Sequence, residues 1–150
     1  MENVLLSVHV VAGILFIGPV AVTTSLFPRF APSASSTASA ADAPVGGVEP
    51  AKLLHRITRT YGIMALTVPL VGLVLAAVQG RLGEIWITIA MVLTAVAGAL
   101  LVLRIVPAQR DALGSASDPR RLANLRALTG VFNLMWVAVV VIMIVRPGAE

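Results

Sequence analysis

His9 is the residue of this chain best placed to do chemistry, because it is the one ionisable side chain well inside a long apolar stretch, Val4–Phe27. It lies about 7 Å from the start of that stretch at helical rise. A polar group at such a depth is costly and therefore suggests a function. Two interpretations are open: a neutral imidazole hydrogen-bonded to a neighbouring helix or headgroup, or an axial ligand of haem or another metal.

The side chains that could contact His9 are those at the same depth in the membrane. Counting from the ends of the other apolar stretches puts Thr88, Met91 and Met143 near its level, whereas His55 lies a membrane thickness away. A bis-histidine site within one subunit is therefore excluded. We expect no bound cofactor, with haem b held by His9 and Met143 as the alternative, since methionine in an apolar helix more often only packs.

A polar stripe marks the last apolar stretch, Ala127–Val145. Asn133 lies about 10 Å from the basic edge of this stretch, on one helix face with Phe132 and Trp136. Asparagine inside a membrane usually hydrogen-bonds across helices, and tryptophan near the midplane is unusual. The stripe predicts a helix–helix interface, either within the protein or with a partner subunit.

Several activities are excluded by what the sequence lacks. No carboxylate falls inside an apolar stretch, so there is no Asp/Glu proton relay and no ion-coordinating pair for a pump. The chain has no cysteine, which excludes disulfides, thiolate metal sites and thiol catalysis. Because phosphate-binding glycine loops and nucleophile–base pairs are also missing, we expect no catalytic residues and no metal site.

Long apolar segments position these residues: Val4–Phe27, Tyr61–Val78, Ile85–Leu103 and Ala127–Val145. About 20 apolar residues cross a bilayer as a helix, which alone satisfies its backbone in lipid. The composition agrees, at 58% hydrophobic and 12% charged residues with a mean hydropathy of +0.95. We predict one all-α integral membrane domain over 1–150, a bundle of four transmembrane helices.

The flanking residues predict where the helices begin and end, at about 4–30, 52–79, 84–106 and 119–146. Asp118 and Pro119 form a good helix start, as N-cap and first helical residue. Pro107 is expected to break or kink the third helix. The Pro-, Gly- and Ser-rich stretch 31–50 predicts a flexible cytoplasmic loop. Small residues at fourfold spacing, among them Gly72, Ala76 and Gly80, predict close helix contacts.

The distribution of basic residues predicts the orientation. Of the 11 lysines and arginines, only Arg81 and Arg146 lie at the end that holds the termini. The basic end is cytoplasmic by the positive-inside rule, which places both termini in the periplasm of a multi-pass bacterial plasma-membrane protein. The net charge of +4 then reflects topology and contact with anionic headgroups. It does not indicate nucleic-acid binding.

The first and last helices carry a family resemblance. The first helix contains Leu5–Gly13 and ends in Phe27-Pro28-Arg29-Phe30, and the last continues from Arg121–Arg126 to Val139–Val145. These segments resemble the small four-helix bacterial membrane proteins related to HemJ-type protoporphyrinogen oxidase and CopD-like domains. The resemblance implies a haem-binding oxidoreductase in which His9 matches the haem-associated histidine. The lysine that this family carries in helix three has no counterpart in Ile85–Leu103.

A second resemblance rests on size and composition. Four-span, Ala/Val/Arg-rich chains of this length are similar to accessory subunits of actinobacterial cytochrome bcc–aa3 respiratory supercomplexes. Such subunits need no catalytic residues. The leading hypothesis is therefore a non-catalytic accessory or assembly subunit of a larger membrane complex, with a respiratory complex as the implied partner; the HemJ-like oxidoreductase is the alternative.

Overall fold

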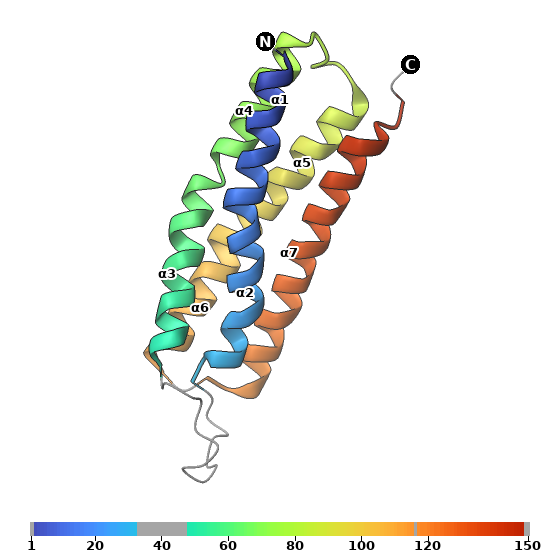
Figure 1. The fold of residues 1–150 in the computed structure, drawn as a ribbon. Coiled ribbons are helices and arrows are strands. Elements are labelled where there is room, and N and C mark those ends of the chain that lie inside the picture. Colours follow the sequence, from blue (N-terminus) through green and yellow to red (C-terminus); the bar gives the residue numbers. More distant parts are fainter. Residues whose placement is uncertain (1, 33–47, 116, 149–150) are drawn as a thin grey trace.

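The fold is all-α. The computed structural model describes residues 2–32, 48–115 and 117–148. These residues contain four helices long and apolar enough to cross a membrane, which lie side by side (Figure 1): Asn3–Phe30, Glu49–Val78, Ile85–Gly114 and Pro119–Val145. The predicted fold class is confirmed at this level, and the helix lengths and hydropathies suit a multi-pass membrane protein.

Most of these spans are built from shorter elements. Span one comprises α1 (Glu2–Ala12), the π-helical η1 (Gly13–Ile17) and α2 (Gly18–Phe30). Span two comprises α3 (Glu49–Met64) and α4 (Thr67–Val78). Span three comprises α5 (Ile85–Leu100), the π-helical η2 (Leu101–Ile105) and α6 (Val106–Gly114), and span four is the single helix α7 (Pro119–Val145).

Prolines explain the interruptions. Proline lacks an N–H, and its ring crowds the carbonyl group four residues earlier, so the helix must locally change its hydrogen-bond register. Pro19, Pro69 and Pro107 each follow an interruption by a few residues. The residue four before each proline lies inside the interruption, at Leu15, Ala65 and Leu103 respectively. The spans therefore continue through the prolines and do not end there.

The third span corrects one sequence-based expectation. It was expected to end near Val106, but the π-helical turn η2 absorbs the conflict with Pro107 and the helix continues to Gly114. The second helix also begins earlier than expected, at Glu49. The predicted start of the fourth helix is confirmed, since the Asp118 side chain accepts a hydrogen bond from the Arg120 N–H at 2.8 Å. Most of the loop predicted at 31–50 lies outside the described residues.

Arginines mark a common level along the bundle. In three spans, one arginine lies 19 residues from the residue that ends the apolar part at the termini side. The pairs are Arg59 with Val78, Arg104 with Ile85, and Arg126 with Val145. At helical rise this is about 28 Å, close to the hydrocarbon thickness of a bilayer. Span one is tied to the same level, because Thr23 Oγ1 and Thr58 Oγ1 lie 2.8 Å apart in a buried hydrogen bond.

The helices extend past this level at what we call the basic end. Glu49–Thr58, for example, adds about 15 Å of helix beyond Arg59. Most of the principal hydrophobic core lies at or beyond the arginine level, with Phe27, Ile105 and Leu125 at most 2% exposed. If the arginine level marks the edge of the hydrocarbon, this end lies in water and must bury its apolar side chains as a soluble bundle does.

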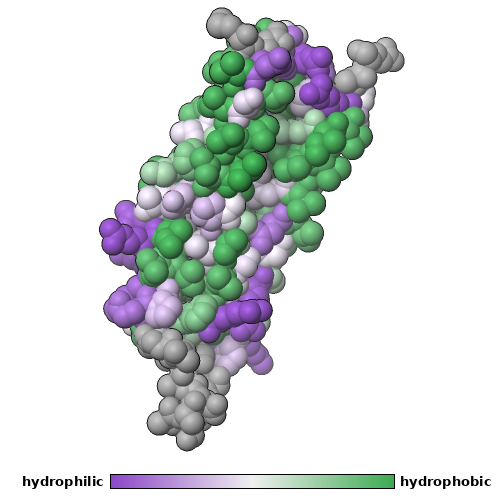
Figure 2. Space-filling model, viewed as in Figure 1, coloured by the Kyte–Doolittle hydropathy of each residue, from purple (hydrophilic) through white to green (hydrophobic). Residues whose placement is uncertain are grey.

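The opposite end, which we call the termini end, is packed more loosely. Here α1 packs on α4 and α5 packs on α7, while contact between these pairs is sparse among the described residues (Figure 1). A small cluster of Ala76, Trp86 and Ile87 joins α4 to α5. Hydrophobic surface covers much of this half of the molecule below a hydrophilic patch at its tip, and further hydrophilic patches lie towards the basic end (Figure 2).

Candidate functional site

His9 lies against α4. Its Nδ1 is 3.0 Å from the Val68 carbonyl oxygen, a bond between spans one and two. Gly72 makes this approach possible, since a Cβ at that position would stand only 2.7 Å from His9 Cε1. With Nδ1 donating to the carbonyl, a neutral ring has Nε2 as its acceptor. Of the sequence interpretations, the geometry matches the imidazole bonded to a neighbouring helix.

The depth of His9 is greater than its own position in span one suggests. Gly72 and Val68 lie 6 and 10 residues before Val78, so the imidazole contacts α4 at about 9 to 15 Å from the outer end of that helix. The ring therefore reaches towards the middle of the apolar zone. A hydrogen bond there is made away from water, and its loss would leave a polar nitrogen in hydrocarbon.

Met143, the expected second haem ligand, lies in a different cluster. It packs with Met91 and Ile142 against the Ala76, Trp86 and Ile87 cluster. Thr88, the remaining outer-leaflet candidate, is exposed on α5. The structure brings His9 to α4 and places Met143 at the contact between α7 and the α4–α5 hairpin, so it does not bring the two residues into one cluster.

The stripe of Phe132, Asn133 and Trp136 lies where α7 meets α2. Asn133 Nδ2 donates to Ser25 Oγ at 3.0 Å, and Phe132 is only 2% exposed. The Phe132 and Trp136 rings meet edge to face, with centroids 6.2 Å apart and planes at 73°. Asn133 Oδ1 and Trp136 Nε1 are buried without a hydrogen-bond partner among the described residues. The stripe is a helix–helix contact with spare hydrogen-bonding capacity.

Some polar partners escaped the sequence analysis. Ser25 and Gln109 bond to residues of other spans: Ser25 to Asn133, and Gln109, which is completely buried, through Oε1 to His55 Nδ1 at 3.1 Å. Gln109 shares a helical face with Ile105 and Ala112, and that spacing is the signal that could have found it. Ser25 gives no such signal because it lies at an exposed position.

Arg81, Glu84 and Arg146 cluster around Trp86 at the termini end. Arg81 pairs with Glu84 at 3.5 Å, and the Trp86 indole N–H donates to Glu84. The Arg146 guanidinium lies 5.6 Å from the Trp86 ring centroid. This arrangement anchors the hairpin to the end of α7. Among the described residues no group of three or more His, Cys, Asp or Glu side chains could hold a metal ion.

Comparison with protein families, curated proteins and solved structures finds no match to this chain.

Proposed function

We propose that this protein is an integral membrane subunit that works by associating with another membrane protein through the Asn3–Pro19 part of span one. The observation that carries the proposal is that this part of span one is poorly covered by the other helices of the protein. No side chain of Asn3–Pro19 is buried, although this segment spans most of the apolar zone. Val4, Ile14 and Leu15 are 67%, 68% and 56% exposed.

Exposed apolar side chains alone cost nothing in lipid, so the support comes from how membrane helices associate. Such helices are held by close packing and by hydrogen bonds between them, without a hydrophobic driving force. Along α1 the protein supplies one such bond, from His9 to Val68, and leaves the remaining faces open. A second membrane protein packed on these faces would give span one the contacts that the chain itself does not supply.

A respiratory complex is the partner that the resemblance to accessory subunits implies, and it stays a prediction. Haem binding by His9, which the HemJ-like resemblance implies, stays a prediction as well. We favour association over haem chemistry because the ring already bonds to Val68 and lies on Gly72.

Orientation is the first testable part of this proposal. Both described chain ends lie at the termini end (Figure 1), and the charge distribution puts that end in the periplasm. We expect alkaline phosphatase fused after residue 150 to be active, and green fluorescent protein inserted within 33–47 to fluoresce. A cytoplasmic reporter at residue 150 would overturn the orientation.

Association is tested by bulky substitutions at matched depths. Leu15 on span one and Leu134 on α7 are 56% and 70% exposed, and each lies eight residues from the basic edge, marked by Thr23 and Arg126. We expect Leu15→Trp to abolish co-purification of a membrane partner in mild detergent, because the indole blocks close helix contact. Leu134→Trp should retain the partner.

Two outcomes would contradict the proposal. One is a wild-type protein that migrates as a monomer with no stoichiometric membrane partner after mild extraction from its native membrane. The other is equal loss from both variants, which would indicate a general packing defect. Retained helicity by circular dichroism serves as the folding control.

A further inference from the structure

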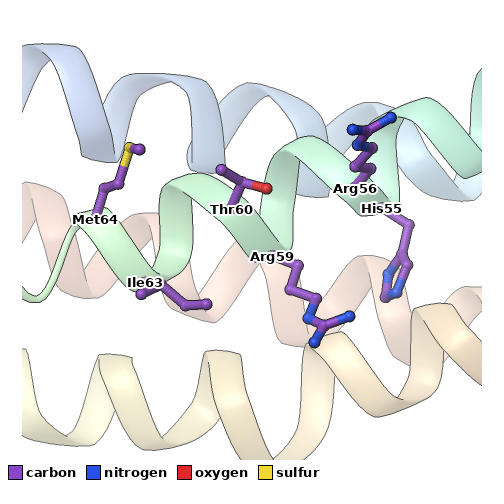
Figure 3. A pocket seen from close by; sticks show the side chains of 6 residues that line it. All are labelled: His55, Arg56, Arg59, Thr60, Ile63 and Met64. Carbon is purple, nitrogen blue, oxygen red and sulfur yellow. The ribbon is translucent and has the colours of Figure 1, made fainter.

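A shallow groove lies on α3 near the arginine level. Its volume is about 480 Å³, and it is lined by His55, Arg56, Arg59, Thr60, Ile63 and Met64. These residues form rows at i, i+4 spacing, Arg56–Thr60–Met64 and His55–Arg59–Ile63, which project to opposite sides (Figure 3). The two guanidinium groups therefore flank the groove from opposite rows.

The positive charge of the groove is not neutralised by the described part of the chain. The ion pairs found there are Lys52–Glu49 and Arg81–Glu84, so neither Arg56 nor Arg59 has a carboxylate within 4.0 Å. Both arginines are exposed. Paired guanidinium groups provide forked donors that match phosphate oxygens well.

His55 is held at the groove by a hydrogen bond to a buried residue. Its Nδ1 lies 3.1 Å from Oε1 of Gln109, a completely buried residue of α6. This bond orients the imidazole at the edge of the groove. The site is thus partly organised by the bundle, unlike a freely rotating surface arginine.

The groove changes from polar to apolar across the edge of the hydrocarbon zone. Arg59 marks that edge, while Ile63 and Met64 lie about one turn further into the apolar zone and are 64% and 44% exposed. The exposed Thr60 hydroxyl lies between the charged and the apolar lining. A ligand that suits both parts carries an anionic phosphate at one end and a hydrocarbon chain at the other.

We propose that this groove binds one anionic phospholipid, with its phosphate between Arg56 and Arg59 and an acyl chain along Ile63 and Met64. The shared chemistry is phosphate recognition, and the source of the phosphate is a lipid rather than a soluble anion. The site is independent of partner association, since it lies on α3 at the basic end and not on span one.

The test is native mass spectrometry of the full chain in detergent, titrated with dioleoyl phosphatidylglycerol. We expect one tightly bound lipid, weakened about 30-fold by Arg56→Gln/Arg59→Gln, since losing each guanidinium–phosphate contact weakens binding about fivefold. The matched control is Arg104→Gln/Arg126→Gln, which removes the same charge from other helices at the level of Arg59. It should weaken binding by less than about threefold.

The remaining arms identify the source of the phosphate. Ile63→Asn should weaken phosphatidylglycerol binding, and inorganic phosphate at the same concentration should not displace the lipid. Equal binding of inorganic phosphate with no effect of Ile63→Asn would overturn the lipid assignment. Equal losses of lipid affinity in the two arginine double variants would overturn the site and leave only general surface electrostatics. The absence of a stoichiometrically bound lipid would overturn the site outright.

Discussion

Leu125→Ala is expected to lower the free energy of unfolding by about 2 to 5 kcal/mol, the range for a buried leucine that leaves a cavity. Leu125 is 2% exposed and lies at the basic end, in the principal core with Leu122 and Ile105. The arginine level predicts that this end lies outside the hydrocarbon, so burying that side chain removes apolar surface from water as in a soluble protein.

The matched control lies on the same helix. Leu134→Ala removes the same atoms from a side chain that is 70% exposed within the apolar zone, so its effect should stay within about 0.5 kcal/mol. Steric trapping of unfolding in bilayer discs measures both values. Similar losses for the two variants would contradict a core concentrated at the basic end.

Gly72→Ala is the second large effect that we expect. The new Cβ would stand 2.7 Å from His9 Cε1, so the imidazole must shift away from α4, and we expect this shift to break its bond to Val68. Overpacking costs about 1 to 3 kcal/mol, and a hydrogen bond between membrane helices contributes about 1 kcal/mol. We expect a loss of about 2 to 4 kcal/mol in the same unfolding assay.

The test of this mechanism is a double-mutant cycle with His9→Ala. Without the imidazole, Gly72→Ala should be neutral or stabilising by about 0.5 to 1 kcal/mol, because alanine is the better helix former. Additive losses would contradict the contact. A haem absorption band that disappears in His9→Ala would instead assign the ring to a cofactor.

The broad architecture was accessible from the sequence because lipid leaves few choices. An apolar stretch of spanning length must be a helix, so the four described spans and the start of α7 at Asp118 follow from hydropathy and capping. Whether the third helix ends or continues at Pro107 could not be predicted from the sequence. A proline can end a helix or be accommodated by a π-helical turn, and the surrounding packing decides between them.

Contacts between helices were predicted only in part. Gly72 was expected at a close helix contact, and the structure confirms it, but the same spacing rule also chose Gly80, which instead adopts a φ of 67° beyond the end of α4. Spacing defines a face of a helix without defining its neighbour. For the same reason the Asn133 stripe was evident in the sequence, whereas its partner Ser25, 108 residues away, was not.

The uneven placement of the core gives the two ends different thermodynamics. Unfolding the basic end exposes apolar surface to water and so carries a large positive heat-capacity change, with stability that weakens on strong cooling as well as on heating. Separating the helices at the termini end exchanges protein contacts for lipid contacts and carries little of that signature. Temperature and urea therefore act mainly on the part of the bundle beyond Arg59, Arg104 and Arg126, while lipid composition acts on the rest.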